Sequence, residues 1–323
     1  KTESFLLPIL LRLVAESMEW GQQAPINRWW ESTNGTWRSL RESESRPAAI
    51  RALVLYPTNA LVEDQMTRLR RAIWRINADA SRGPLWFGRY TGETLGTGAL
   101  PPGRERQHGV ANESRPLQSD FARLRDANQP EDVLAQFTDP GQGEMVSRWD
   151  MISAPPDILV TNYSMVNVML MRDIEDAMFT ATKAWLAEDP SHVFTLVVDE
   201  LHLYRGTAGS EVALILRNLL NRLDLDPASP QLRVIATSAS LTDSPEGRAY
   251  LEQFFAIEKD SFQILKGNAE EIPETDIPNS ALDGASPLQI SQAISAVCWD
   301  AGEERLRATP ARTIAERLFG SAD

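Results

Sequence analysis

Two adjacent carboxylates at the end of an apolar run are the residues of this chain best suited to chemistry. Asp199 and Glu200 follow the segment 195–198, with the sequence TLVV. A short, mostly aliphatic run predicts a buried parallel strand, so both acids emerge at its carboxyl end. One carboxylate can hold a hydrated Mg²⁺ while the other orients an attacking water, as in a magnesium–nucleotide site. The alternative is a strand that simply ends in two solvated acids.

The first two residues could supply the phosphate-binding part of the same site. A phosphate-binding loop ends in Gly-Lys-Ser/Thr and opens a helix. Here Lys1-Thr2 precedes the apolar residues 5–13, which predict a helix that is buried almost all round. Lys1 would reach the β- and γ-phosphates and Thr2 would ligate Mg²⁺. We therefore expect the loop glycines upstream of residue 1 and a longer protein. A coincidental Lys-Thr pair is the alternative, which the acidic pair at 199–200 makes the weaker one.

Small polar residues follow three further predicted strands. They are Thr58, Asn59, Thr91, Gly92, Thr161 and Asn162. Each could simply cap a helix, because Thr and Asn are common at helix N-termini. Three such positions on one sheet could instead form a track for consecutive backbone phosphates.

A fourth strand ends in Ser238-Ala239-Ser240. Small hydroxyl residues at this place can connect the acidic pair to the nucleic-acid side of the sheet. An ordinary turn at the end of a strand is the alternative.

Short β-branched runs alternate with helical stretches, which predicts an α/β fold with a parallel sheet and helices on both faces. The predicted strands cover residues 51–56, 85–90, 157–162, 194–199 and 232–237. Ligands of such sheets bind at the carboxyl ends of the strands, where the polar motifs lie. Residues 20–50 and 93–155 are too long for ordinary connections and are interpreted as inserted subdomains or lids.

The domain organisation is predicted to change near residue 265. Residues 1–265 would form the α/β domain, and residues 266–323 a linker with a helical connector. The segment 267–287 is rich in residues typical of linkers. Two helical pieces are predicted after it, at about 287–302 and 309–320.

Composition excludes several classes of protein. Cys298 is the single cysteine, so no disulfide forms within the chain and a cytoplasmic protein is predicted. No apolar run is long enough to span a bilayer. The net charge is −13, with an excess of Lys and Arg in residues 1–125 and of Asp and Glu in the rest. An acidic total argues against indiscriminate nucleic-acid binding, but allows a narrow groove of backbone amides.

Other polar and aromatic residues leave alternatives open. The arginines at 68, 70, 71 and 75 could face solvent on a helix or form a basic flank beside the phosphate track. The tryptophans within 20–37 are expected to pack a small core of that insertion rather than stack on bases. His108, His192 and His202 lack metal-ligand spacing, which disfavours a metal hydrolase. His108 and His192 are expected to be solvated.

Taken in order, these motifs resemble the DExH-box helicases of superfamily two over roughly residues 1–265. The resemblance rests on Lys1-Thr2-Glu3, YPTNAL with Gln65, YTGET, TNYSM, Asp199-Glu200-Leu201-His202 and Ser238-Ala239-Ser240. The longer wording DELHLYRGTAGSEVALILRNLL is most similar to a branch of large bacterial helicases. That branch includes RecQ-like repair helicases and helicases of anti-phage systems such as DISARM and Druantia.

The resemblance implies a RecA-like ATPase domain that works opposite a second RecA-like domain, with ATP and Mg²⁺ between them. It implies that Lys1, Thr2 and Glu3 belong to the nucleotide site, that Thr2 and Asp199 hold Mg²⁺, and that Glu200 activates water. His202, Ser238 and Ser240 would couple hydrolysis to strand movement. The implied contacts to the backbone of one strand, with DNA favoured over RNA, are Thr58, Asn59, Gln65, Thr91, Gly92, Thr161 and Asn162.

The sequence departs from the family pattern in several places. The upstream glycines, the adenine-reading segment and the second RecA-like domain are not in it, and Ser240 replaces the usual Thr. We therefore expect this segment alone to be inactive as an ATPase. The first hypothesis is a helicase or translocase, with a partner subunit in a defence complex. The alternative is a RecA-like scaffold that binds nucleic acid without hydrolysing ATP.

Overall fold

The computed structural model describes residues 2–21, 24–31, 36–79, 81–102, 104–266, 299–300 and 305–306. The chain divides into two compact units, residues 1–264 and 265–323. In the second unit, β7 (Trp299–Asp300) and β8 (Arg305–Leu306) form a short antiparallel pair. A strand thus stands at 299–300, where the end of a helix was predicted. The rest of the predicted linker and connector lies outside the described residues.

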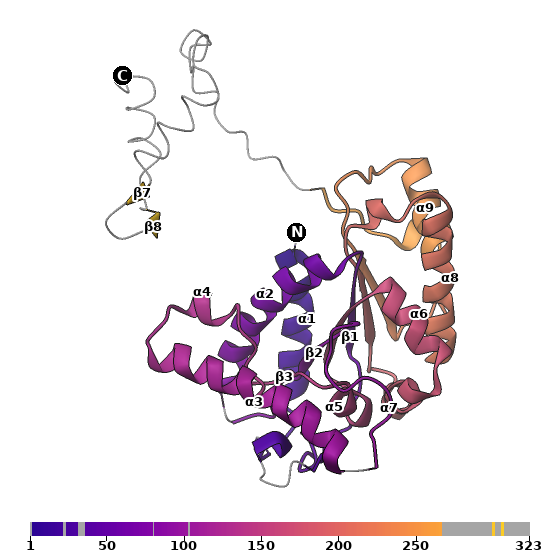
Figure 1. Ribbon diagram of the computed structural model, residues 1–323. Helices are drawn as coiled ribbons and strands as arrows, with labels where there is room; N and C mark the ends of the chain where they lie inside the picture. The colour runs from indigo at the N-terminus through magenta and orange to yellow at the C-terminus, as the bar shows by residue number, and fades with distance from the viewer. Residues whose placement is uncertain are drawn as a thin grey trace, which may run out of the picture. The chain divides into compact units, whose positions relative to one another are not determined.

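The first unit alternates strands with helices along the chain (Figure 1). Its strands are β1 (Ala52–Tyr56), β2 (Phe87–Tyr90), β3 (Glu144–Met145), β4 (Ile158–Asn162), β5 (Phe194–Val198) and β6 (Leu232–Ala236). Its α-helices are α1 (Thr2–Ser17), α2 (Asn59–Asn77), α3 (Arg104–Asp126), α4 (Glu131–Leu134), α5 (Arg148–Ser153), α6 (Tyr163–Met171), α7 (Asp176–Glu188), α8 (Gly206–Arg222) and α9 (Pro245–Phe255). Short 3₁₀ helices cover Trp29–Glu31 (η1), Asp173–Glu175 (η2), Leu201–Leu203 (η3) and Lys259–Ser261 (η4). None of the helices in the described ranges is long and apolar enough to cross a membrane.

The six strands form one sheet in the order β3-β2-β4-β1-β5-β6. All its strand pairs are parallel; in the centre, Val54 of β1 lies between Val160 of β4 and Val197 of β5. The predicted parallel α/β sheet is therefore confirmed, and each predicted strand lies within two residues of its observed start. β3 was not predicted, because it consists of only two residues inside the long insertion 93–155.

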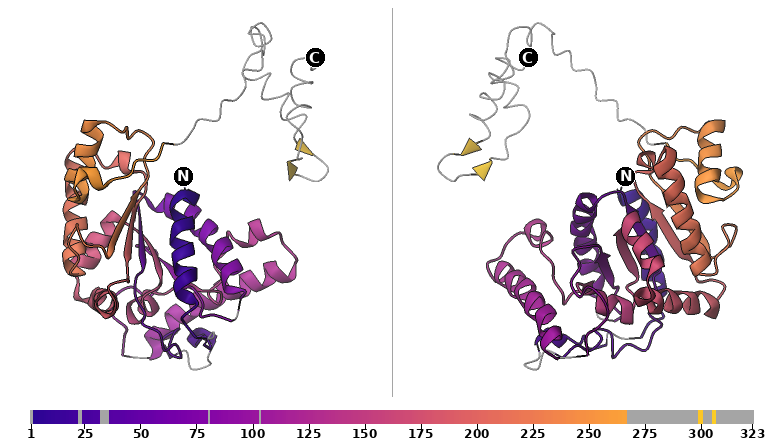
Figure 2. Two further views of the ribbon diagram at one scale, coloured as in Figure 1. Left: turned by 180° about the vertical axis from the view of Figure 1, so that it is seen from behind. Right: turned by 45° about the vertical axis from the view of Figure 1, so that its right-hand side comes forward.

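Helices cover both faces of the sheet, as expected for strands that are apolar on both sides. Figures 1 and 2 show α1 and α2 on one side and α6, α7 and α8 on the other. Alternate residues of β1 divide between two cores: Val54 and Tyr56 share one with α1 and α2, whereas Leu53 and Leu55 share the other with α7 and α8. All five β1 residues are buried.

Helix α1 is amphipathic rather than buried all round, which corrects the prediction. Phe5, Ile9 and Leu13 pack into the core, while Leu7 and Leu11 are about 60% exposed. The three buried residues recur at a spacing of four, so they occupy one stripe of the helix.

The two insertions pack against each other, so the tryptophans do not form a separate small core. Trp29 lies 6.3 Å from Trp149 between ring centroids, and both belong to the core that includes the sheet. Buried Asp150 accepts hydrogen bonds from Trp29 Nε1 (3.3 Å), Trp37 Nε1 (3.1 Å) and the Leu40 amide (3.2 Å). Burial raises the pKa of Asp150 to about 7, although these hydrogen bonds oppose the shift. One carboxylate thus joins residues 29–40 to α5.

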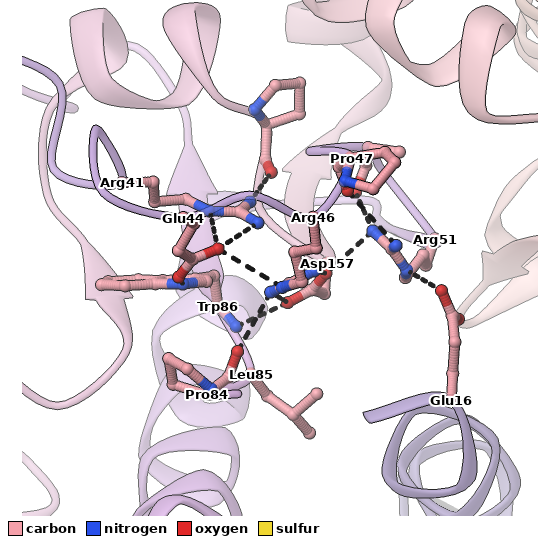
Figure 3. Close-up of polar contacts among 12 residues, drawn as sticks. Glu16, Arg41, Glu44, Arg46, Pro47, Arg51, Pro84, Leu85, Trp86 and Asp157 are labelled. Carbon is pink, nitrogen blue, oxygen red and sulfur yellow. Dashed lines mark hydrogen bonds and ion pairs between the residues drawn. The ribbon is translucent and has the colours of Figure 1, made fainter. Parts of the chain in front are cut away.

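A buried ion network lies at the amino ends of β1 and β4 (Figure 3). The carboxylate of Asp157 is fully buried and accepts from Arg46 Nη1 (2.7 Å), Arg51 Nη1 (3.0 Å) and the Trp86 amide (2.8 Å). Burial alone would raise the pKa of Asp157, but the Arg46 and Arg51 guanidiniums lower it to about 2. The network therefore connects the first insertion to the sheet at the edge opposite the acidic pair.

Candidate nucleotide and nucleic-acid site

The acidic pair lies in a tight turn directly after β5. Asp199 is 5% exposed, whereas Glu200 is partly exposed. Glu200 adopts the left-handed conformation, with φ 51° and ψ 46°, which is unfavourable for a residue with a Cβ. The Asp199 carboxylate is enclosed, whereas the Glu200 side chain is partly exposed and has its Oε2 buried beside His202. The two acids therefore have different environments, as two different chemical roles require.

Thr237, which follows β6, holds this turn in place. Its hydroxyl donates a short hydrogen bond to Asp199 Oδ1 and accepts one from the Glu200 amide (3.2 Å). The Leu201 amide also donates to the Thr237 carbonyl (2.7 Å). Thr237 was not predicted as a site residue, because the motif interpreted at this strand end begins at Ser238. A Thr placed directly before Ser238 at a strand end was the available signal.

His202 stands between the acids and the turn after β6. Its Nδ1 lies 3.1 Å from Glu200 Oε2 and 3.4 Å from the Ala239 amide nitrogen. A proton on Nδ1 allows donation to Glu200, whereas an unprotonated Nδ1 can accept from Ala239. The Nδ1 atom of His202 can therefore form a hydrogen bond either with Glu200 or with the Ala239 amide, but not with both at once.

The two serines after β6 lie beside this group. Ser238 Oγ accepts from the Ser240 amide (3.3 Å), and Ser240 Oγ accepts from Arg205 Nη2 (2.8 Å). Arg205 was not predicted as a site residue, although it is the first cation after the DELH segment. Gly209 of α8 approaches the backbone just before Arg205, since a Cβ there would lie 2.2 Å from the Tyr204 carbonyl oxygen. The structure thus brings together Asp199, Glu200, His202, Ser238 and Ser240 with Thr237 and Arg205.

The surroundings of Asp199 fit a divalent cation. Burial and the negative charge of Asp199 raise the pKa of Tyr56, which packs beside it. Among the described residues, no Lys, Arg or His forms an ion pair with Asp199, although it is almost fully buried. The same part of the chain holds no group of three or more His, Cys, Asp or Glu side chains suited to a metal. Mg²⁺ in nucleotide sites commonly takes one or two carboxylates and completes its shell with water and phosphate.

The phosphate-binding residues predicted at the N-terminus are only partly placed. Lys1 and the side chains of Thr2 and Glu3 lie outside the described residues. Helix α1 begins at Thr2 and lies along the sheet (Figure 2). Glu16, near its end, pairs with Arg51 (2.7 Å) at the amino end of β1. The start of α1 is therefore directed toward the carboxyl edge, where Asp199 lies.

Asn59 and Asn162 meet at the carboxyl ends of β1 and β4. Asn162 Nδ2 donates to Asn59 Oδ1 (2.6 Å), and Asn162 Oδ1 caps α6 by accepting from the Met165 amide (2.8 Å). Capping, one of the two alternatives, is thus the observed role of Asn162. Thr58 precedes α2 without capping it and is exposed. Thr58 and Asn59 therefore remain available at the surface.

The remaining predicted nucleic-acid residues differ in exposure. Thr161 is fully buried and its hydroxyl donates to the Tyr90 carbonyl (2.6 Å), so this side chain joins β4 to β2 and does not face a groove. Gln65 is 5% exposed in α2. Thr91 is also buried, but Gly92 next to it faces open space. Only Gly92 of this group offers a surface for a ligand.

Neither the arginine helix nor the histidines form a further site. Each of the four arginines on α2 pairs with a carboxylate: Arg68 with Asp64, Arg70 with Glu144, Arg71 with Asp132 and Arg75 with Glu131. They therefore form no free basic flank. His108 lies within α3 rather than in a loop. His192 stacks on Trp185 at 4.6 Å between ring centroids, so it is packed rather than solvated.

A cavity of about 400 Å³ lies at the opposite, amino edge of the sheet. Trp20, Arg46, Arg51 and Trp185 are among its lining residues. Both arginines are engaged with Asp157, and Arg46 also stacks at 3.7 Å on the Trp20 ring. The charges of these two arginines are thus balanced by Asp157 within the fold (Figure 3), and the cavity is remote from the acidic pair.

Comparison with curated proteins finds a bacterial relative. This chain is similar to the Druantia protein DruE. The two are 32% identical over 329 residues, covering 87% of this chain and 16% of the Escherichia coli (strain UMEA 4076-1) protein. The similarity confirms the resemblance to the branch that includes Druantia proteins. The chain spans only 16% of the length of this relative. No family model matches the chain.

Solved structures similar to this chain include the DUF1998 helicase MrfA. The crystal structure of MrfA bound to DNA and AMPPNP is 20% identical, with a TM-score of 0.38, over 68% of this chain and 21% of that one. The crystal structure of MrfA alone is also 20% identical, with a TM-score of 0.36, over 64% and 22%. At these scores the likeness supports no inference about ligands.

Proposed function

We propose that this chain is the first motor domain of a helicase or translocase that hydrolyses ATP in the presence of nucleic acid. In this proposal its acidic residues form one half of the nucleotide site. The observation on which the proposal rests is the cluster of Asp199, Glu200 and His202 tied to β6 by Thr237. An enclosed carboxylate that pairs with no cation among the described residues, and a partly exposed carboxylate beside it, suit metal binding and water activation respectively. The similarity to DruE and the order of the motifs support the same function.

In the proposed mechanism Asp199 holds Mg²⁺, which would neutralise charge on the phosphates of bound ATP. Glu200 accepts a proton from the attacking water, and His202 moves between Glu200 and Ala239 as that carboxylate changes its state. Ser238 and Ser240, in the turn after β6, would pass the change to the nucleic-acid side of the sheet. Lys1 and Thr2 are proposed to bind the phosphates and Mg²⁺, because the start of α1 is directed toward this edge.

The nucleic acid is proposed to cross the carboxyl ends of β1, β2 and β4, over Thr58, Asn59 and Gly92. DNA is proposed over RNA from the resemblance to DNA helicases of the same branch. The proposal includes a second RecA-like domain of the same protein, which would complete the ATP site, and a partner subunit in a defence complex. The segment alone is then expected to hydrolyse no ATP.

Mg²⁺-dependent ATP binding by the complete protein tests this proposal. Asp199→Asn should weaken ATP binding at least tenfold with Mg²⁺ present and leave binding without Mg²⁺ nearly unchanged, because only the cation contact is lost. Asp126→Asn, which removes an exposed carboxylate at the end of α3, is the matched control. Equal Mg²⁺ dependence in both variants would contradict the proposed role and favour a scaffold that does not hydrolyse ATP.

A further inference from the structure

The turn that follows β2 presents two backbone amides to the surface. The Thr91 amide donates to Thr94 Oγ1 (2.9 Å) and the Thr94 amide to the Thr91 carbonyl (3.2 Å), which closes the turn. The amides of Gly92 and Glu93, between them, donate to no other described residue. A Cβ on Gly92 would meet nothing within 4 Å. Consecutive amides in an open turn are a common way to bind an anion.

Arg148, the first residue of α5, lies beneath this turn. Its Nη2 donates to the carbonyls of Thr91 (2.5 Å) and Gly92 (3.2 Å), and the residue is 4% exposed. In a trans peptide the carbonyl of one residue and the amide of the next point in opposite directions. By holding both carbonyls inward, Arg148 therefore turns the Gly92 and Glu93 amides outward.

The positive charge of Arg148 is not balanced by an ion pair in the part of the chain that the structure describes. Its guanidinium lies 5.2 Å from the centre of the Tyr90 ring. Glu175, a nearby acid, is engaged by Arg172 and by the Tyr90 hydroxyl (2.7 Å). Burial lowers the pKa of Arg148, yet an arginine remains protonated in proteins. A buried cation without a carboxylate is costly.

Two further polar atoms at the turn are buried and have no hydrogen-bond partner among the described residues. They are Nε of Arg148 and Oγ1 of Thr91. Such groups are rare in folded proteins and call for an explanation. The side chain of Glu93 does not supply one, because it is exposed and its nearest cation is Arg89 at 4.0 Å. An anion bound at the outward amides would balance the charge of Arg148 from the other side of the turn, without contacting these two buried atoms.

We propose that Arg148 is a positioning residue for one backbone phosphate of the nucleic acid, which binds at the Gly92 and Glu93 amides. Arg148 fixes the direction of both amides and adds its charge from below. This inference rests on the proposed function, because the phosphate belongs to the nucleic acid proposed to cross this edge.

The test is the salt dependence of binding. The affinity of the complete protein for a fluorescein-labelled 20-nucleotide single-stranded DNA is measured by anisotropy over a range of salt concentrations. Arg148→Gln should weaken binding about tenfold at low salt, because the two amides lose their fixed direction and the site loses a positive charge. It should also lower the salt slope by roughly 0.7, the value for one phosphate on a single strand. Arg148→Lys keeps the charge and should keep the slope, with a loss of a few-fold in affinity.

Arg75→Gln is the matched control, because it removes one positive charge from an exposed position on α2 that is paired with Glu131. Its slope should equal that of the unmodified protein. A purely structural role of Arg148 would weaken binding without changing the slope, and that result overturns the proposal. If Arg148→Gln fails to fold, a reduced slope in folded Arg148→Lys overturns it equally. If the unmodified protein binds no DNA, both the proposed function and this inference fail. If the unmodified protein binds DNA and Arg148→Gln leaves the salt slope unchanged, only this inference fails.

Discussion

Replacing Thr237 by Val should slow ATP hydrolysis while leaving the fold intact. Valine has nearly the shape of threonine but lacks the hydroxyl that donates to Asp199 and accepts from the Glu200 amide. A hydrogen bond to a charged group contributes about 1.5–3 kcal/mol. If the contact is needed to hold both acids in the transition state, the rate falls tenfold for each 1.36 kcal/mol. The expected loss is therefore about 10- to 150-fold.

Single-turnover hydrolysis by the complete protein, with ATP and single-stranded DNA at saturating concentrations, measures this loss. Thr237→Ser keeps the hydroxyl and should remain within about threefold of the unmodified rate. Thr242→Val makes the same chemical change at an exposed position and should have no effect. Hydrolysis by Thr237→Val at the unmodified rate, or equal losses in the Val and Ser variants, would refute the reasoning.

Two predictions concern the buried acids away from the site. Asp157→Asn should lower the free energy of unfolding by about 3–5 kcal/mol at pH 7 in denaturant titrations, because it leaves Arg46 and Arg51 without their buried partner. The folded pKa of Asp157 is about 2, below its unfolded value. About 2.5 kcal/mol of the stability of the unmodified protein should therefore disappear progressively as the pH falls from about 5 to 1. A difference between the two proteins that stays constant over this range would contradict this prediction. The folded pKa of Asp150 is about 7, above its unfolded value, so the unmodified protein should lose stability as the pH rises from about 4 to 7, by an amount on the order of 4 kcal/mol. Thermal melting of Asp150→Asn should show a flatter pH profile in that range, and parallel profiles would contradict the assignment.

The sheet could be predicted from the sequence because its strands are continuous apolar runs. Residues 157–162 and 194–199, for example, are apolar on both faces and end in polar residues, which marks both the strand and its carboxyl end. The side-chain direction at those ends could not be predicted. Thr161 and Asn162 are neighbours with similar chemistry, yet one is buried against Tyr90 and the other caps α6. Strand pairing decides between them, and it depends on residues distant in the sequence.

The acidic pair was predicted from local sequence, whereas its supporting residues were not. Thr237 and Arg205 act through contacts across the turns after β5 and β6, 35 to 38 residues apart. Arg148 was missed for the same reason, since its two carbonyl acceptors lie 56 and 57 residues before it. The insertions were predicted from their length, but the packing of residues 29–40 and α5 around Asp150 depends on contacts that span 110 residues or more. The spacing of residues along the chain does not predict such long-range contacts.

The measurement that tests the central claim most directly is nucleic-acid-stimulated ATP hydrolysis by the complete protein with Glu200→Gln. Glutamine keeps the shape and a hydrogen-bonding group but cannot accept a proton from water. We predict nearly unchanged ATP binding and hydrolysis slowed by roughly a hundredfold or more, the usual effect of losing a positioned base. Glu211→Gln, the same change at an exposed residue of α8, should hydrolyse at the unmodified rate. Unmodified hydrolysis by Glu200→Gln would contradict the proposed mechanism at its centre.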